Sequence, residues 1–318
     1  MTCSLISIII NNYNYGRFIN RAIDSALGQT YTPVEVIVVD DGSTDYSREI
    51  IRSYGDLIKP IFKPNGGQDS SFNIGFEQAK GEIICFLDAD DMFVPNKLEK
   101  IAACFEQQPN IGWCFHTIEL QNIKTCETLG KTLAFPGESN DRSASCDFRR
   151  AIRRGQLPFY PASTSGLCFH RNLLQQVLPM TETFANTSAD RYVRAAAMGL
   201  APGYFLAEEL TIQGIHDSNI STLRKDRPFI PEREIVAAYL LRTHFPDLSQ
   251  YANRLFARGL SAYQRTQKTS TVIEPEYEGL IQDYWQLCSP LAKLAIAAVS
   301  LYHSRPWRKE GTFLSKAA

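Results

Sequence analysis

The sequence predicts an α/β protein, in which a mainly parallel sheet carries helices on both faces and a helical C-terminal region follows. Three observations predict this class. Continuous apolar runs rich in β-branched residues recur along the first part of the chain, as in strands that are buried on both faces. Segments of about ten residues with helical apolar spacing separate these runs. After about Arg224 the pattern changes to a series of amphipathic helices.

The first part of the chain alternates strand and helix. We expect strands at 4–11, 34–40, 58–62, 82–87 and 111–117, with helices at 17–27, 69–79 and 96–107. Ser43-Thr44-Asp45, after the second strand, is a cluster typical of a helix N-terminus. This order of elements favours parallel strands joined by crossover helices.

The alternation of strand and helix stops in the region 118–156, which has few apolar runs and many Ser, Arg, Asp and Gly residues. We expect a long irregular insertion over one face of the sheet. Further elements should follow: extended segments at 163–169 and 209–215, helices at 172–178 and 189–198, and C-terminal helices at 232–243, 248–265, 276–287 and 291–302.

Composition narrows the class of protein. The chain has 318 residues, 44% of them hydrophobic and 21% charged, which is typical of a soluble globular protein. A net charge of -1 argues against nucleic-acid binding, which needs a basic face. Eight cysteines are scattered without a CxxC pair, so we expect reduced, buried thiols in a cytoplasmic protein. The N-terminus has no cationic segment typical of a signal peptide, and no apolar run of about 20 residues predicts a membrane span.

The predicted helix at 291–302 is the most apolar part of the C-terminal region. It is too short to span a bilayer, and Arg305, Trp307, Arg308 and Lys309 follow it. A helix packed on the body of the protein is the favoured interpretation. Peripheral contact with a membrane, at its inner face, is the alternative.

Polar residues follow three of the predicted strands. They are Asn11-Asn12, Asp40-Asp41-Gly42 and Asp88-Ala89-Asp90-Asp91. In an open parallel sheet the carboxyl ends of the strands form the ligand-binding edge. Carboxylates as close as those of Asp88 and Asp90 favour a shared hard cation, Mn²⁺ or Mg²⁺, which in turn binds phosphate oxygens. Asp91 could instead cap the following helix.

A second group of polar residues fits the rest of a nucleotide. One carboxylate of Asp40 and Asp41 can accept a hydrogen bond from the N3–H of a pyrimidine, and the other is expected to cap a helix. Asn11 could bind the same base edge. The turn that ends in Gln68 precedes a helix, so its N–H groups could approach phosphate or sugar, although a plain loop is the alternative.

Together these segments resemble a known family. SIIINNYNYGRFINRAIDSALGQTY, VEVIVVDDGSTD and GEIICFLDADDMFVPNKL are similar to the two landmarks of family 2 glycosyltransferases, which have the GT-A (Rossmann-like) fold. The resemblance implies that Asn11 and Asp41 contact uracil, that Asp88 lies near the ribose, and that Asp90 is the metal ligand of a DxD motif. It also implies a GT-A domain at 1–223, with a nucleotide-binding half at 1–117 and an acceptor-side half at 118–223, followed by a helical region at 224–318.

Three later segments extend the resemblance. SADRYVRAAAMG is similar to the helix that carries the catalytic carboxylate, and Asp190 holds that position, although Ala189 stands where Glu is common. EELTIQGIHDSNIS is similar to a later strand and loop, where His216 would complete the metal shell or bind the diphosphate, although Gln213 replaces a frequent Arg. The segment at 163–166 resembles an acceptor-side loop; an ordinary turn is the alternative.

The resemblance implies metal-dependent, inverting transfer of a sugar from a nucleotide sugar, a UDP-sugar in particular, to a glycan or lipid-linked acceptor in bacterial surface polysaccharide synthesis. The Gln-x-x-Arg-Trp motif of processive members is absent from the sequence, so one sugar per encounter is expected. A sugar-nucleotide pyrophosphorylase would need a Gly-rich loop with a basic residue after the first strand, where this chain has NNYNYG. A degenerate nucleotide-sugar-binding module is the other alternative. Ala189 and Gln213 favour it, and the intact Asp41, Asp88 and Asp90 argue against it.

Overall fold

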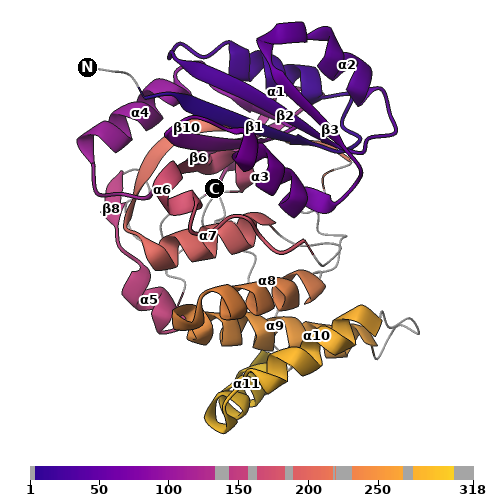
Figure 1. The fold of residues 1–318 in the computed structure, drawn as a ribbon, viewed down its shortest axis with the longest axis vertical. Coiled ribbons are helices and arrows are strands. Elements are labelled where there is room, and N and C mark those ends of the chain that lie inside the picture. Colours follow the sequence, from indigo (N-terminus) through magenta and orange to yellow (C-terminus); the bar gives the residue numbers. More distant parts are fainter. Residues whose placement is uncertain are drawn as a thin grey trace.

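The computed structural model describes residues 4–132, 143–156, 163–182, 189–217, 219, 231–267 and 275–303. A ten-stranded sheet in the order β3-β2-β1-β4-β9-β6-β10-β5 forms the body, with β7 paired to β6 and β8 paired to β10. Helices lie on both sides of the sheet, and the C-terminal helices extend away from it (Figure 1).

The first four long strands are parallel to one another, as predicted. They are β1 (Ile6–Asn12), β2 (Val34–Asp41), β3 (Lys59–Lys63) and β4 (Ile83–Asp88). The helices between them are α1 (Ile19–Leu27), α2 (Ser47–Ser53) and α3 (Gly67–Gln78), with a 3-10 turn at Gly55–Leu57. The carboxylate of Asp45 accepts a hydrogen bond from the backbone N–H of Ser47 at the start of α2, at 3.0 Å. The N-terminal alternation of strand and helix is therefore confirmed.

The second half completes the same sheet with antiparallel pairs, so the sheet is mixed. α4 (Lys97–Gln107) leads to β6 (Trp113–Asn122), and β10 (Gly203–Ile215) runs parallel to β6. β9 (Leu167–His170), which follows the 3-10 turn Thr164–Gly166, is antiparallel to both β4 and β6 and joins the two parallel groups. The short β5 (Asp91–Phe93) is antiparallel to β10.

The expectation of an irregular insertion at 118–156 is wrong for the part that the structure describes. β6 continues to Asn122 and pairs with β7 (Thr128–Lys131), while β8 (Ala144–Cys146) pairs with β10 and α5 (Arg149–Arg153) follows. Residues 133–142 lie outside the described part. These strands lack a continuous apolar run because they are short or lie at the edge of the sheet. In β7, for example, every side chain is exposed.

Alternate side chains of β1 supply two separate cores. Ile8 and Ile10 pack in the cluster that includes α1 and α4, whereas Ile9 packs in the cluster that includes Phe72 of α3. Successive side chains of a strand point to opposite faces of the sheet. Because helices cover both faces, the N-terminal strands are apolar throughout.

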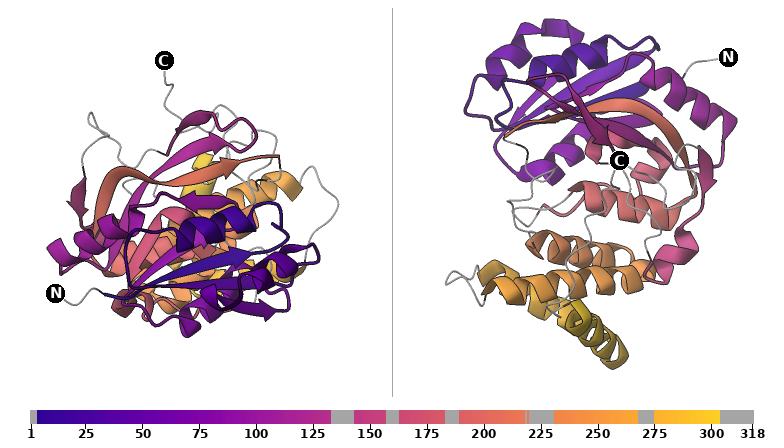
Figure 2. Two further views of the ribbon diagram at one scale, coloured as in Figure 1. Left: turned by 90° about the horizontal axis from the view of Figure 1, so that it is seen from above. Right: turned by 180° about the vertical axis from the view of Figure 1, so that it is seen from behind.

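The second core continues from the sheet into the C-terminal helices. α6 (Arg171–Leu174) and α7 (Ala189–Leu200) lie under the sheet, and beyond them come α8 (Pro231–His244), the turn Pro246–Leu248, α9 (Ser249–Gln267), α10 (Pro275–Gln286) and α11 (Pro290–His303). All four predicted C-terminal helices are confirmed. The view from behind shows the same stack, with α10 and α11 farthest from the sheet (Figure 2). None of the described helices is long and apolar enough to cross a bilayer.

Candidate active site

The ends of β1 and β4 bring three predicted residues together. Asn11 is the register partner of Asp88, and its Nδ2 donates to Asp88 Oδ1 at 3.0 Å. Gln68 Nε2, from the first turn of α3, donates to the same oxygen at 3.3 Å and lies 3.4 Å from Thr164 Oγ1. The ends of two parallel strands therefore place an amide and a carboxylate side by side, as the sequence predicted, and the start of α3 adds a second amide.

A second pair meets beside the first, from distant parts of the chain. His216 Nε2 lies 3.1 Å from Asp90 Oδ2, and Asn219 Nδ2 lies 3.2 Å from the same oxygen. Two ligands at right angles in one coordination shell, each about 2.1 Å from the metal, lie roughly 3.0 Å apart. The spacing of the carboxylate oxygen and the imidazole nitrogen therefore fits two neighbouring ligands of one divalent cation.

Negative charge accumulates at this edge. Burial, followed by the charges of Asp90 and Asp190, raises the pKa of Asp88 to about 7. Burial, followed by the charges of Asp90 and Asp88, also holds the pKa of Asp91 well above its ordinary value. A cation bound at Asp90 would offset this repulsion, so the electrostatics fit a metal as the geometry does.

Asp91 does not cap the following helix, which corrects one expectation. It is buried in β5, where its Oδ2 accepts from Ser165 Oγ at 2.6 Å and its Oδ1 accepts from the N–H of Gly214 at 3.1 Å. The buried Lys97 lies next to this group and donates to the carbonyl of Ser165 at 2.8 Å. Asp91 therefore holds three segments of the chain together behind the edge that bears Asp88 and Asp90.

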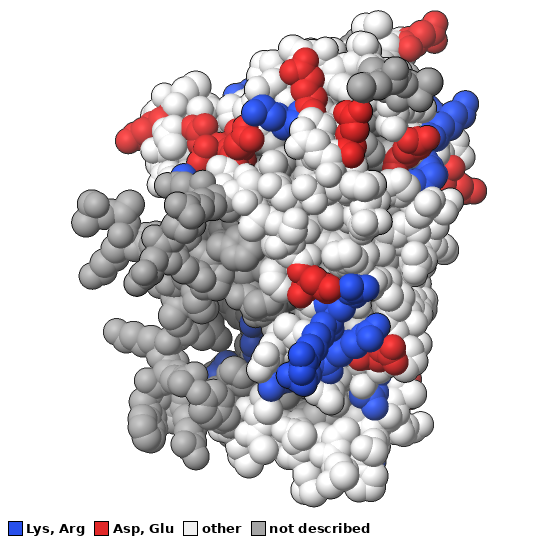
Figure 3. All heavy atoms as spheres, turned by 90° about the vertical axis from the view of Figure 1, so that its left-hand side faces the viewer, with Lys and Arg blue, Asp and Glu red and all other residues white. Residues whose placement is uncertain are grey.

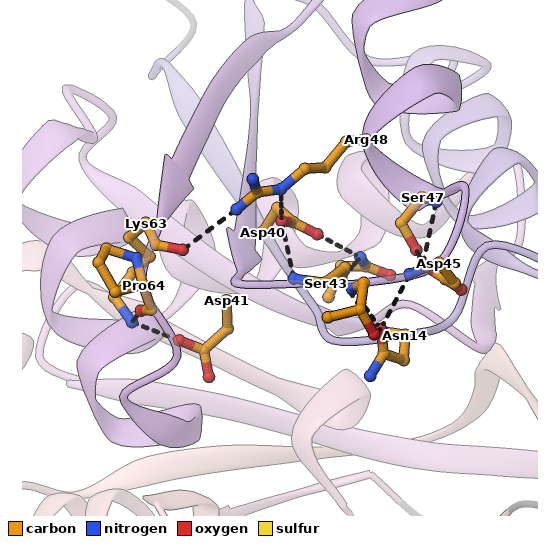
Figure 4. A network of polar contacts seen from close by, with 11 residues as sticks. Asn14, Asp40, Asp41, Ser43, Asp45, Ser47, Arg48, Lys63 and Pro64 are labelled. Atoms are coloured by element: carbon orange, nitrogen blue, oxygen red, sulfur yellow. Dashed lines mark hydrogen bonds and ion pairs between the residues drawn. The ribbon is translucent and has the colours of Figure 1, made fainter.

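Asp40 and Asp41 are neighbours in the sequence but lie in two different environments (Figure 4). Asp40 is fully buried and accepts from Arg48 Nε at 2.8 Å, Asn12 Nδ2 at 2.9 Å and the N–H of Ser43 at 3.1 Å. Both of its oxygens are used within the turn after β2, so Asp40 stabilises that turn and does not face a ligand.

Asp41 faces the neighbouring turn at 64–67. Its Oδ1 accepts from Lys63 Nζ and from the N–H of Gly66 at 2.8 Å, and its Oδ2 accepts from the N–H of Gly67 at 2.8 Å. Gly67 has a φ of 87°, a conformation that favours glycine and that turns its N–H toward the carboxylate. Asp41 thus lies at the edge of the sheet, joined to the turn that leads into α3.

Asp190 lies in the first turn of α7, close enough to Asp88 for its charge to raise the pKa of that carboxyl. Its Oδ2 lies 3.4 Å from the guanidinium of Arg194, one helical turn later, and Oδ1 accepts from the N–H of Arg191 at 2.7 Å. The helix thereby fixes a carboxylate near the aspartates of the strand edge.

Three contacts of this arrangement were not predicted. Phe18 stacks on His216, and Lys63 pairs with Asp41. Ser165, within the segment 163–166 that resembles an acceptor-side loop, instead bridges two segments behind Asp88. Lys63 ends β3 beside the binding edge, so the rule that ligands bind at strand ends could have found it. The sequence carries no signal for the other two contacts, which depend on tertiary packing.

This sheet, with aspartates at its edge and a helical region behind it, has the GT-A fold. The chain belongs to glycosyl transferase family 2, and residues 7–170, just over half of the 318, match that family. The family to which the sequence motifs pointed is therefore confirmed.

Similar proteins agree with this assignment. An uncharacterized glycosyltransferase of Nostoc sp. is 37% identical over 219 residues, which cover 67% of this chain and 66% of that protein. One of Rickettsia typhi is 50% identical over 95 residues, 30% of each chain. Among solved structures, S. aureus TarS 1-349 in complex with UDP-GlcNAc has a TM-score of 0.62 at 17% identity, and the match covers 94% of this chain and 89% of that one.

Proposed function

We propose that this glycosyltransferase is metal-dependent and inverting, and that it moves a sugar from a UDP-sugar to a hydroxyl group of a glycan or lipid-linked acceptor in bacterial surface polysaccharide synthesis. The observation that carries the proposal is the contact of Asp90 with His216 at the sheet edge, with the carboxylates of Asp88 and Asp190 nearby. The similar fold of a protein solved with UDP-GlcNAc supports the choice of donor.

The nucleoside of the donor would bind between the ends of β1 and β2. The buried Oδ1 of Asn11 has no hydrogen-bond partner among the described residues, so it is an acceptor for the base or the ribose. Asp41 would accept the N3–H of uracil. It already accepts from Lys63, Gly66 and Gly67, so a bound base would share or replace one of these donors.

Asp90 and His216 would hold the cation, Mn²⁺ or Mg²⁺. Among the described residues no cluster of three His, Cys, Asp or Glu side chains is placed to hold a metal, and the donor diphosphate and water would supply the further ligands. The cation would neutralise the charge that develops on the departing diphosphate.

Asp190 would act as the general base for the acceptor hydroxyl. Arg194 and the N–H of Arg191 hold its carboxylate in place. A positioned base contributes roughly 10²–10⁴ in rate. A single displacement at the anomeric carbon inverts its configuration.

The test is release of UDP from UDP-GlcNAc and other UDP-sugars in the presence of Mn²⁺. We expect release that EDTA abolishes and that falls roughly 10²–10⁴-fold in Asp190→Asn. The exposed Asp283 of α10 provides a matched control, because Asp283→Asn should leave the rate unchanged. Full activity of Asp190→Asn would refute the assignment of the base, and full activity in EDTA would refute the metal.

A binding module without turnover would give a different pattern. Ala189 and Gln213, in place of the family's common Glu and Arg, favour that alternative. Such a module would show a thermal shift with UDP-sugars but no UDP release under any condition. Wild-type turnover with any UDP-sugar excludes it.

A further inference from the structure

The last described helix presents an unusual apolar face to solvent. Leu291, Leu294 and Leu301 of α11 are 79%, 69% and 69% exposed. The spacings of three and seven residues place these three on one stripe of the helix, and Leu287, in the turn between α10 and α11, is also exposed. The opposite side of α11 is buried, including Ile296 and Ser300, so the helix is anchored to the body while its leucines point outward.

This stripe differs from the other exposed apolar side chains. Elsewhere on the described surface the large exposed ones are spread over separate elements: Tyr13, Leu27, Tyr46, Leu57 and Leu129. Scattered apolar residues are ordinary on a protein surface, whereas a contiguous group marks an interaction site. Four exposed leucines within fifteen consecutive residues therefore mark an interaction site.

The charge of this part of the chain indicates which partner. From Ser289 onward the sequence carries five cations, Lys293, Arg305, Arg308, Lys309 and Lys316, and one acid, Glu310. Trp307 lies among them. Apolar residues on one helix face, flanked by cations and a tryptophan, are the pattern of a helix that lies in the interface of an anionic bilayer.

The position of α11 permits such contact. It lies at the end of the molecule farthest from the sheet (Figure 1). Seen from the side that carries α5, that lowest end shows no charged side chains, and a cluster of Lys and Arg with acidic side chains beside it lies just above (Figure 3). α5 and the residue after it carry Arg149, Arg150, Arg153 and Arg154, of which Arg149 pairs with Asp147 and Arg153 with Asp247. Neutral surface bordered by cations fits a membrane whose headgroups are anionic.

We propose that the stripe of Leu291, Leu294 and Leu301, together with Leu287, docks the protein onto the surface of an anionic lipid bilayer. The leucines would enter the boundary between headgroups and acyl chains, and the neighbouring cations would meet lipid phosphates. Pairing with a second copy would also cover the stripe. However, it would bring two cationic segments together, whereas an anionic leaflet attracts both charge and leucines.

The test is co-sedimentation of the full chain with phosphatidylcholine vesicles, alone or containing phosphatidylglycerol. We expect binding to the mixed vesicles that falls at least ~10-fold in Leu291→Glu/Leu294→Glu, because burial of two leucines is replaced by repulsion. Leu57→Glu is a matched control: Leu57 is 68% exposed but lies near the nucleotide-binding part, so this change should not affect sedimentation.

Further measurements keep the proposal falsifiable. Both substitutions are at exposed sites, so circular dichroism and melting temperature should be unchanged. Light scattering after gel filtration reports the oligomeric state. Absence of vesicle binding, or equal binding by the double variant, overturns the proposal. A dimer that the double variant dissociates, with no binding to vesicles, would replace it with self-association. The readout is independent of sugar transfer, so this proposal and the proposed function can fail separately.

Discussion

His216 lies stacked on Phe18, with ring centroids 4.3 Å apart and 29° between the ring planes. The stack joins α1 to the loop after β10 and holds the imidazole with its Nε2 toward Asp90. A side chain from outside the aspartate motif therefore sets the direction of the second proposed metal ligand.

Phe18→Ala should weaken Mn²⁺ binding by roughly tenfold, because residues that orient a ligand typically affect metal affinity by 10–100-fold. Titration of the protein with Mn²⁺, followed by calorimetry or electron paramagnetic resonance, measures this. Tyr13→Ala removes an exposed aromatic residue of the same segment and should change nothing. Unaltered affinity in Phe18→Ala would show that the stack does not orient the metal ligand.

Ser165→Ala should lower stability by about 1–3 kcal/mol, the range for leaving buried polar partners unsatisfied. Its hydroxyl donates to Asp91 and accepts from the N–H of Asp88 at 3.0 Å, so one change affects both. Urea denaturation gives the value. Ser163 is the control: its buried Oγ has no hydrogen-bond partner in the described part of the chain, so Ser163→Ala should cost much less. Equal losses in the two variants would contradict the bridging role.

Gly203→Ala should destabilise the protein by roughly 1–3 kcal/mol through overpacking. A Cβ at Gly203 would lie 2.0 Å from the indole of Trp113, which is fully buried beside β10. Gly279 lies within α10 with no atom within 4 Å of its would-be Cβ. Gly279→Ala should therefore stabilise by about 0.5–1 kcal/mol, since alanine is the better helix former. Thermal denaturation should give a lower melting temperature for Gly203→Ala and a higher one for Gly279→Ala. A higher melting temperature in both variants would refute the steric argument.

Acid should destabilise the protein partly through His116. Burial, followed by the charge of Lys97, holds the pKa of His116 well below its ordinary value, while its Nδ1–H donates to the carbonyl of Thr117 at 2.8 Å. Below about pH 6.5 the unfolded chain takes up a proton that the folded protein does not. The contribution to stability is therefore complete above that pH and is lost as the pH falls, by up to about 1.4 kcal/mol per pH unit.

The substitution His116→Asn removes the titrating imidazole and keeps an amide N–H near the position of Nδ1. His116→Asn should thus show a shallower loss of unfolding free energy between pH 7.5 and about pH 5 in urea titrations. His244, whose pKa is lowered by burial, gives an effect of the same sign and remains in the variant. Parallel pH profiles for the two proteins would exclude His116 as a contributor.

The sequence allowed most of the framework to be predicted, because a strand buried on both faces has to be apolar throughout. β1, with Ile8 and Ile10 on one side and Ile9 on the other, is the clearest case. β5 was not predicted because a strand of three residues is too short to show a periodic pattern of apolar residues. β7 and β8 were not predicted because strands at the edge of a sheet carry no continuous apolar run.

The candidate site was predictable where strand ends determine position. Asn11 and Asp88 are neighbours because β1 and β4 are parallel, whereas the closeness of Asp90 to His216 was implied by resemblance to a family. Burial of Asp91 and Lys97 could not be predicted, since charged residues of these types are nearly always exposed unless paired. Both side chains find a hydrogen-bond partner in Ser165, which is far away in the sequence.

The antiparallel strand β9 has a mechanical consequence. It is hydrogen-bonded to β4 on one side and to β6 on the other, so the part that bears Asp88 and the part that leads to His216 share one unbroken sheet. A hinge between them would have to tear strand pairs apart, and rigid-body closure of two lobes around a donor is therefore excluded by the architecture. Adjustment to substrate has to come from side chains and from the turns that leave the strand edge, such as the glycine turn held by Asp41.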